Sequence, residues 1–582
     1  MDNNSDIVLD SVSYSYPNEE KNVLSDVSFQ IEKGKFTVIM GRTGAGKTTT
    51  LMCMNGIIPQ LMEGNLSGSV SVSNMNVAKY RVQTMVKHIG LVMQDSETQV
   101  FGKTVEEDVA FGPRNYMIPR DKILQMVDDA LKRVRLSGYE KRETSQLSGG
   151  ERQRLAIAGI LAMNPSIIAL DEPTSELDPI GREEIYQTIT DLRNEKDKTI
   201  VAVEHSSQEI SQKADHLIII NDGHVTWSGI PSEFFRDLNL VEQNSIKPIP
   251  VSIFGWEFYK HGMIEKQQVP LTVPEAFSLA KNILDGKKIL EPTPAEKPAP
   301  VQAPKEPVLV VDHLTYRYSN DHVALNDISL KINRGDFVAI IGQNGAGKTT
   351  LAKHFNGILT PTSGNVFVCG QKVQEKNSYE LTQYIGYVFQ NPDHQIFCTT
   401  VFNELAYGLQ NLGLKEEEIK KRVDDVLELT NLSEYRDVHP FSLGKGQRQM
   451  IAVASIIVMH PSVLVVDEPT TGLDWLGINR MMDLICKLHQ SGTTIVMITH
   501  DMDIVARYAT RAVVMKKGNI VLDGATREVF SKPDVLRDAY VSPPQCVELS
   551  AKLNSLGLDG VVLDMRQLAD MVINSCKKER KS

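Results

Sequence analysis

The chain has 582 residues, enough for about two to four domains, and its 41% hydrophobic and 23% charged residues are typical of globular proteins. Its formal net charge of -11 argues against nucleic acid as the main partner, because phosphate backbones attract basic surfaces. No apolar run reaches the roughly 18 residues of a membrane-spanning helix, and none of the six cysteines forms a C-x-x-C pair. We therefore expect neither a spanning helix nor a zinc or iron–sulfur site.

Two phosphate-binding loops follow short apolar runs, Phe36 to Met40 and Phe337 to Ile341. The first loop consists of Gly41, Arg42, Thr43, Gly44, Ala45, Gly46, Lys47 and Thr48, and the second of Gly342, Gln343, Asn344, Gly345, Ala346, Gly347, Lys348 and Thr349. Both fit G-x-x-x-x-G-K-[ST], in which backbone N–H groups surround phosphate oxygens, the lysine reaches the β- and γ-phosphates and the threonine holds Mg²⁺. The two loops predict two sites for nucleoside triphosphate with Mg²⁺.

The sequence around these loops is duplicated. Val92-Met93-Gln94 corresponds to Val388-Phe389-Gln390, and a weaker match relates Val269 to Val273 with Val561 to Met565 in the segments that follow each copy. We predict five regions: a nucleotide-binding domain at 6–236, its tail at 237–290, a proline-rich linker at 291–307, a second domain at 308–533 and a C-terminal tail at 534–582. We expect the basic residues that end the chain to be a solvated tail.

Short apolar runs alternate with helical stretches inside each copy, for example Ile167 to Leu170 and Thr199 to Val203. Apolar strands alternating with helices indicate a largely parallel sheet whose two faces are covered. We therefore predict an α/β fold for each domain.

Polar residues at the ends of these runs supply what ATP hydrolysis needs. Asp171 and Asp467 end apolar strands and are expected, with Gln94, Gln390 and the loop threonines Thr48 and Thr349, to complete the Mg²⁺ site. Glu172 and Glu468 follow and are placed to orient or deprotonate the attacking water, and His205 and His500 are expected to sense the γ-phosphate. Tyr16 and Tyr318 precede the loops and can stack on adenine, with core packing as the alternative.

Leu147-Ser148-Gly149-Gly150-Glu151-Arg152-Gln153-Arg154 resembles the signature motif of ATP-binding cassette (ABC) proteins, and Thr470 to Asp474 resembles their D-loop. The resemblance implies P-loop NTPase domains with an inserted helical subdomain. It also implies that the two cassettes pair within the chain, with the signature of one facing the phosphate loop of the other. Ser148, Gly149 and Gly150 would then bind ATP.

The second copy departs from this signature, because Gly444 and Lys445 stand where the first copy has Ser148 and Gly149. Ser442 lies two residues early and would need a register shift to substitute. A serine hydroxyl, glycine N–H groups and a helix N-terminus make a good anion site. We therefore expect most ATP turnover at the site built on Lys348 and Ser148.

Gln390-Asn391-Pro392-Asp393-His394-Gln395-Ile396-Phe397 resembles energy-coupling-factor importers, which include cobalt and vitamin transport ATPases. The resemblance implies a peripheral protein on the cytoplasmic side of the cell membrane. Its partners would be a transmembrane coupling protein and a membrane protein that captures the substrate. We expect Gln94 to Asp108 and Gln390 to Glu404 to form the docking surface, with exposed carboxylates at Glu106, Glu107, Asp108 and Glu404 around Phe101 and Phe397.

Two other functions fit a tandem ABC ATPase: a soluble protein acting on ribosomes or nucleic acid, and an exporter. The first is disfavoured because the linker is proline-rich, both histidines are present and the charge is acidic. The exporter reading is disfavoured by the segment from Gln390 to Phe397 and by the lack of a fused membrane domain.

Overall fold

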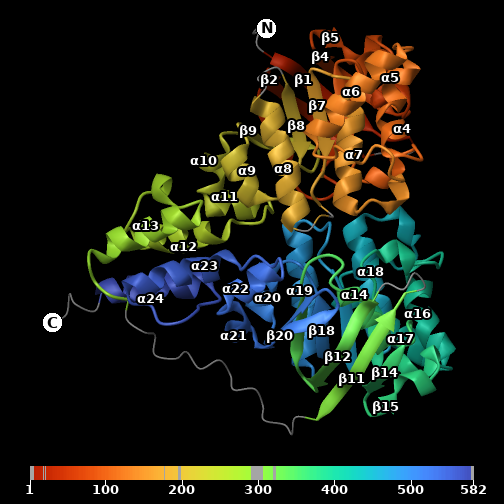
Figure 1. Ribbon diagram of the computed structural model, residues 1–582, viewed down its shortest axis with the longest axis vertical. Helices are drawn as coiled ribbons and strands as arrows, with labels where there is room; N and C mark the ends of the chain where they lie inside the picture. Colours follow the sequence, from red (N-terminus) through yellow and green to blue (C-terminus); the bar gives the residue numbers. More distant parts are fainter. Residues whose placement is uncertain are drawn as a thin grey trace. The chain divides into compact units, whose positions relative to one another are not determined.

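The computed structural model describes residues 5–17, 19, 21–175, 177, 179–194, 198–289, 306–318 and 323–577. They belong to two compact units, Met1–Ser252 and Ile253–Ser582, which Figure 1 colours along the sequence. Most of the predicted linker and the basic residues 578–582 lie outside the described residues. No helix in the described ranges is both long and apolar enough to cross a membrane.

A six-stranded sheet forms the centre of the first unit. Its strand order is β10-β9-β3-β8-β7-β6, with parallel pairing from β9 through to β6 and an antiparallel edge strand β10. The strands are β3 (Phe36–Met40), β6 (Ile89–Val92), β7 (Ile167–Asp171), β8 (Thr199–Val203), β9 (His216–Asn221) and β10 (His224–Gly229). Every residue of β3, β7 and β8 is buried, which explains their largely apolar sequences. This confirms the predicted α/β fold.

A second sheet, which was not predicted, is antiparallel with the order β2-β1-β4-β5. It consists of β1 (Ser5–Ser15), β2 (Leu24–Glu32), β4 (Asn65–Val72) and β5 (Met75–Asn76). In β2 buried and less buried positions alternate, as in a sheet with one solvated face. Leu51 and Cys53 of α1 (Lys47–Asn55) share one core with Val70 of this sheet and Val203 of the parallel sheet, so the helix after the phosphate loop lies against both.

The remaining helices of this unit cover the sheets and build the insertion between β6 and β7. The insertion contains α4 (Val105–Val109), α5 (Phe111–Asn115), α6 (Arg120–Arg133) and α7 (Gly149–Leu161). The others are α2 (Ile57–Gln60), α3 (Val82–Met85), α8 (Pro179–Asn194), α9 (Ser207–Lys213), α10 (Pro231–Phe235) and α11 (Leu238–Gln243). The helical subdomain implied by the ABC resemblance is therefore present.

The second unit repeats both sheets. Its strand orders are β16-β17-β18-β13-β19-β20 and β12-β11-β14-β15. The strands are β11 (Pro307–Arg317), β12 (Val323–Asn333), β13 (Phe337–Ile341), β14 (Ser363–Val368), β15 (Gln371–Lys372), β16 (Ile385–Val388), β17 (Val463–Asp467), β18 (Thr494–Ile498), β19 (Arg511–Lys516) and β20 (Asn519–Ala525). The helices are α14 (Lys348–Phe355), α15 (Ser378–Leu381), α16 (Val401–Asn411), α17 (Glu416–Leu429), α18 (Lys445–Ile457), α19 (Trp475–Gln490), α20 (Met502–Tyr508) and α21 (Thr526–Phe530).

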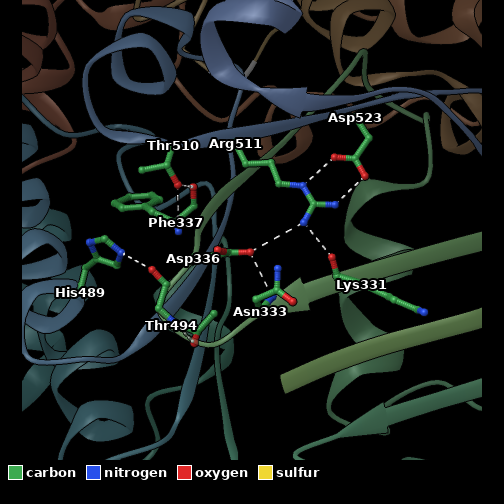
Figure 2. A network of polar contacts seen from close by, with 10 residues as sticks. Lys331, Asn333, Asp336, Phe337, His489, Thr494, Thr510, Arg511 and Asp523 are labelled. Carbon is green, nitrogen blue, oxygen red and sulfur yellow. Dashed lines mark hydrogen bonds and ion pairs between the residues drawn. The ribbon is translucent and has the colours of Figure 1, made fainter. Parts of the chain in front are cut away.

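A polar network ties the two sheets of the second unit together where the parallel strands begin (Figure 2). Arg511, the first residue of β19, donates to both carboxylate oxygens of Asp523 at 2.7 and 2.6 Å and to Lys331 O at 2.8 Å. Its guanidinium also lies 3.7 Å from Asp336. Because the phosphate loop follows the opposite end of β13, this network fixes the sheets without occupying the nucleotide site.

Helices from both predicted tails pack together within the second unit. They are α13 (Val273–Leu284), α23 (Gln545–Leu553) and α24 (Met565–Lys577). The tails also contain α12 (Pro250–Lys260) and α22 (Pro533–Asp538). Figure 1 shows α13 beside α23 and α24, and Ile289 donates its N–H to Leu556 O at 2.9 Å. The two segments matched in sequence each lead into a helix of this group, α13 or α24.

Candidate functional site

Both phosphate loops have the geometry that their motif requires. Gly41 and Gly342 adopt φ values of 151° and 148°, and a Cβ atom there would lie 1.8 Å from Ile220 O and 2.2 Å from Met515 O. Only glycine fits these positions. The helices α1 and α14 begin at the loop lysines, so their N-terminal N–H groups and dipoles favour a phosphate at the loop.

The loop lysines are buried and folded over their own loops. Lys47 Nζ donates to Gly41 O at 3.0 Å and to Arg42 O at 2.8 Å. Lys348 Nζ makes the matching bonds to Gly342 O at 2.7 Å and to Gln343 O at 2.9 Å. The carbonyl groups hold each ammonium over the glycine-rich turn, where phosphate oxygens can share its charge.

Asp171 and Asp467 end β7 and β17, and both carboxylates are buried. Thr349 donates to Asp467 Oδ2 at 2.8 Å, and the Thr48 side chain interacts with Asp171. Burial raises the pKa of Asp171 to about 6, against the opposing effect of the Thr48 hydrogen bond. Burial also raises the pKa of Asp467.

The remaining oxygen of each aspartate fits a metal ion. The Oδ1 atoms of Asp171 and Asp467 are buried and have no hydrogen-bond partner among the described residues. An unpaired carboxylate oxygen beside a threonine hydroxyl is the oxygen set that Mg²⁺ takes in phosphate-binding proteins. These residues therefore fit the predicted metal.

Three predicted residues of the first copy meet at one carboxylate. Gln94 Nε2 donates to Glu172 Oε2 at 2.9 Å, and His205 Nε2 lies 3.0 Å from Glu172 Oε1. Glu172 has a φ of 46°, and its N–H donates to Val203 O at 3.0 Å, which links it to the strand that precedes His205. A left-handed backbone at a non-glycine residue is typical of constrained functional positions.

The second copy brings together only part of this set. His500 Nδ1 lies 2.8 Å from Glu468 Oε2, and Glu468 has the same left-handed backbone, with a φ of 50°. Gln390 is exposed, unlike Gln94, which is hydrogen-bonded to Glu172. The predicted glutamate and histidine of the second copy are therefore adjacent.

A buried pair beside His205 was not predicted. Thr174 Oγ1 donates to Glu204 Oε1 at 2.9 Å, and the N–H of His205 donates to Glu204 Oε2 at 3.2 Å. Burial raises the pKa of Glu204 to about 7. The position of Glu204, directly after the apolar run Thr199–Val203, was the sequence feature that could have indicated this buried pair. The second copy has Thr499 at this position.

The two predicted adenine-stacking tyrosines lie beside the helices that follow the phosphate loops. The Tyr16 hydroxyl is 3.0 Å from Thr49 Oγ1, and the Tyr318 hydroxyl is 3.0 Å from Thr350 Oγ1. Tyr318 is 40% exposed, so much of its ring is open to contact. Stacking on adenine stays a prediction for both rings.

The signature segments align in the structure as they do in sequence. Ser148 caps α7 with φ −65° and Gly444 caps α18 with φ −64°, so these residues are equivalent. Ser442 lies in a preceding turn and donates to His439 O at 2.7 Å, which leaves the cap of α18 without a hydroxyl. Lys445 extends toward the second D-loop, since a Cβ on Gly472 would lie 3.0 Å from Lys445 Nζ.

Two of the carboxylates predicted to be exposed are buried. Asp108 and Glu404 are only 8% and 4% exposed. Asp108 Oδ1 accepts the N–H groups of Phe101 and Gly102, both at 2.8 Å, and Glu404 Oε2 accepts those of Phe397 and Cys398 at 3.0 and 2.7 Å. The prediction was wrong because these carboxylates satisfy the backbone of the preceding loop rather than the solvent.

The sequence of the chain is similar to that of known proteins of one family. A family model described as ABC transporter matches residues 24–175 and 325–471. A protein of Caldanaerobacter subterraneus subsp. tengcongensis, assigned as an ABC transporter ATP-binding protein, is 41% identical and covers 94% of this chain and 96% of its own length. One of Methanosarcina acetivorans with the same assignment is 39% identical, with coverages of 96% and 92%. Among solved structures, cbiO1 from Clostridium perfringens, described as part of the ABC transporter complex cbiONQ, is 39% identical over 41% of this chain and 97% of that chain, with a TM-score of 0.37.

Proposed function

Because the chain belongs to the family of ABC transporter ATP-binding proteins and is an ATPase with two ATP-binding domains, we propose that it energises an importer of the energy-coupling-factor type. The substrate class is a micronutrient such as a vitamin, cobalt or nickel. The observation that carries the proposal is the segment from Gln390 to Phe397, which has the residues of that importer group and ends in an aromatic side chain that is 62% exposed.

Hydrolysis in the second copy follows from the contacts around Glu468. Lys348 and the N-terminus of α14 bind the phosphates, while Thr349 and Asp467 would hold Mg²⁺, which neutralises phosphate charge when bound. Glu468 orients the attacking water and accepts its proton. His500, 2.8 Å from Glu468 Oε2, holds that carboxylate toward the γ-phosphate.

The first copy carries the same groups, with Gln94 and His205 on the two oxygens of Glu172. From the family pattern we propose that each signature serves the phosphate loop of the other copy. Ser148 then acts at the site of Lys348, and Gly444 at the site of Lys47. On this proposal the two ATP sites differ in their donors to phosphate.

We propose that the exposed aromatic pairs beyond the glutamines dock on the membrane coupling protein. Phe101 lies 6.0 Å from Phe111, and Phe397 lies 4.8 Å from Tyr407, measured between ring centroids. The rings of Phe101 and Phe397 are 72% and 62% exposed, which is unusual for phenylalanine. Apolar anchors with a polar rim are typical of protein interfaces.

The second docking segment is fastened to the signature helix. Arg448 of α18 donates to Asp393 through Nε at 2.6 Å and through a terminal nitrogen at 3.2 Å. A bidentate arginine–carboxylate pair fixes both distance and orientation. A partner that moves the segment after Gln390 therefore also moves α18, which supports the coupling of ATP hydrolysis to transport.

The test is photo-crosslinking in membranes that contain the native partners. Benzoylphenylalanine is placed at exposed Glu107 and Asn403, and at exposed Lys552 on α23 as the matched control. We expect crosslinks to an integral membrane protein from the first two positions, and retention of the chain on salt-washed membranes. Crosslinks from Lys552 alone, or co-purification with ribosomes instead of membranes, would overturn the proposal and favour the soluble alternative.

A further inference from the structure

We propose that Tyr387 is a positioning residue for the metal-binding carboxylate of the second copy, and that the two ATP sites therefore differ in divalent-cation affinity. The proposal rests on the ATPase activity and is independent of the importer assignment. It concerns a residue on β16, beside the strand that ends in Asp467.

The sheet register places Tyr387 within reach of Asp467. Tyr387 pairs with Val465 in the parallel ladder of β16 and β17, and Asp467 lies two residues further on. Residues two apart on a strand point to the same face, so the long tyrosine side chain extends along β17 to the carboxylate. The hydroxyl donates to Asp467 Oδ2 at 2.9 Å.

This hydrogen bond determines which oxygen remains for a cation. Thr349 donates to the same Oδ2 atom at 2.8 Å, so two hydroxyl groups hold one carboxylate oxygen. Oδ1 of Asp467 is buried and has no partner among the described residues. Two donors on Oδ2 restrict the rotation of the carboxylate and leave Oδ1 as the oxygen that can bind a cation.

The tyrosine is itself held rigidly. Tyr387 is 5% exposed, and its ring packs edge-on against Phe389, with 5.0 Å between the centroids. A buried ring with a fixed hydroxyl can hold a second residue at low entropic cost. Phe389 directly precedes Gln390, so the same packing supports the strand that leads to the docking segment.

The first copy lacks this donor. Leu91 pairs with Ala169 in the ladder of β6 and β7, two residues before Asp171, and is thus the counterpart of Tyr387. Leu91 is buried and apolar, and Thr48 is the hydroxyl that bonds to Asp171. Within the described ranges, two hydroxyl groups donate to Asp467, whereas Thr48 is the hydroxyl that interacts with Asp171. The structure assigns the tighter cation site to the second copy.

The test measures Mn²⁺ binding by electron paramagnetic resonance in the full chain with a non-hydrolysable ATP analogue. Lys47→Ala removes the first site, so that the bound ion reports the second. In this background Tyr387→Phe, which keeps the ring, is expected to weaken Mn²⁺ binding about three- to tenfold. Binding of the analogue in EDTA should stay unchanged.

The matched control is Leu91→Met in a Lys348→Ala background, a volume-conserving change at the equivalent position. It should leave Mn²⁺ affinity at the first site unaltered, and that affinity should be weaker than at the second. The proposal is overturned if Tyr387→Phe leaves Mn²⁺ affinity unchanged. It is also overturned if the variant weakens analogue binding equally with and without the ion, since that would show a purely structural role.

Discussion

Ser148 and Glu151 form a closed capping box at the start of the signature helix α7. The N–H of Glu151 donates to Ser148 Oγ at 3.3 Å, and Glu151 Oε2 accepts the N–H of Ser148 at 2.8 Å. A hydroxyl that accepts from the helix keeps its own proton, so Ser148 can still donate to a phosphate oxygen. In the second copy only half of the box remains, because Gln447 accepts the N–H of Gly444 at 3.1 Å.

Gly444→Ser should therefore raise ATP turnover at the site that we propose to be the weaker one, which contains Lys47. A Cβ there would lie 3.7 Å from Gln447 Oε1, an ordinary contact, and φ is −64°, so a serine fits without strain. In a Glu468→Gln background we expect the residual rate of hydrolysis to rise about 10- to 100-fold, because one preorganised hydrogen-bond donor to the developing phosphate charge changes a rate by about that much or more. Phosphate release at saturating ATP measures it. Gly444→Ala adds the Cβ without the hydroxyl, and an equal rise there would contradict the argument.

The two glutamates that we propose to orient the attacking water should contribute unequally to ATP hydrolysis, for the same reason. Glu468→Gln is expected to remove nearly all hydrolysis, because on the proposed pairing its site receives the complete signature of the first copy. Glu172→Gln should leave a measurable fraction, although Glu172 contacts both Gln94 and His205. The experiment compares phosphate release, with ATP binding by each variant as the control. A greater loss from Glu172→Gln than from Glu468→Gln would refute the predicted asymmetry.

The sequence predicts the parts of this site that depend on local motifs. Gly41 and Gly342 have backbone angles that only glycine tolerates, so their loops are recognisable without tertiary information. Asp171 and Asp467 are the last residues of buried strands, and the apolar residues before each of them mark the strand in the sequence. The antiparallel sheets were not predicted from the sequence. Strands such as Leu24–Glu32 alternate between buried and exposed residues, and their pairing with another strand of the sheet is not visible in the sequence.

Residues whose role depends on packing are misjudged from sequence. Asp108 and Glu404 stand on helices that begin with a cap, where carboxylates are usually solvated, yet the preceding loop folds back and buries both. Glu204 is placed in contact with Thr174, thirty residues away in sequence, only when β7 and β8 pair. No pattern of residue types distinguishes such contacts before the sheet is assembled.

Glu204 should make the stability of the first copy depend on pH. Its carboxyl has a folded-state pKa of about 7 because of burial, against a reference value of 4.5. Between these values the folded state binds more protons than the unfolded state, so stability falls as pH rises from about 4.5 to 7 and then levels off. Glu204→Gln should flatten this decline by about 1–3 kcal/mol, measured by denaturant unfolding at several pH values. Glu242 is exposed, and the control variant Glu242→Gln should leave the decline of stability with pH unchanged. If Glu204→Gln also left the decline unchanged, the Glu204 carboxyl would already be ionised at pH 5, and the prediction would be wrong.

Glu404 should stabilise the second docking loop from beneath, whereas its neighbour Asn403 should not. Glu404→Ala leaves the N–H groups of Phe397 and Cys398 without their carboxylate, at a cost of about 1–3 kcal/mol of unfolding free energy. Asn403 is exposed on the same helix, and Asn403→Ala should change stability by less than about 0.5 kcal/mol. Denaturant unfolding gives both values, and hydrogen exchange over 395–400 should accelerate only in Glu404→Ala. If both variants unfold alike with unchanged exchange, Glu404 does not hold this loop, and the exposed ring of Phe397 is positioned by other contacts.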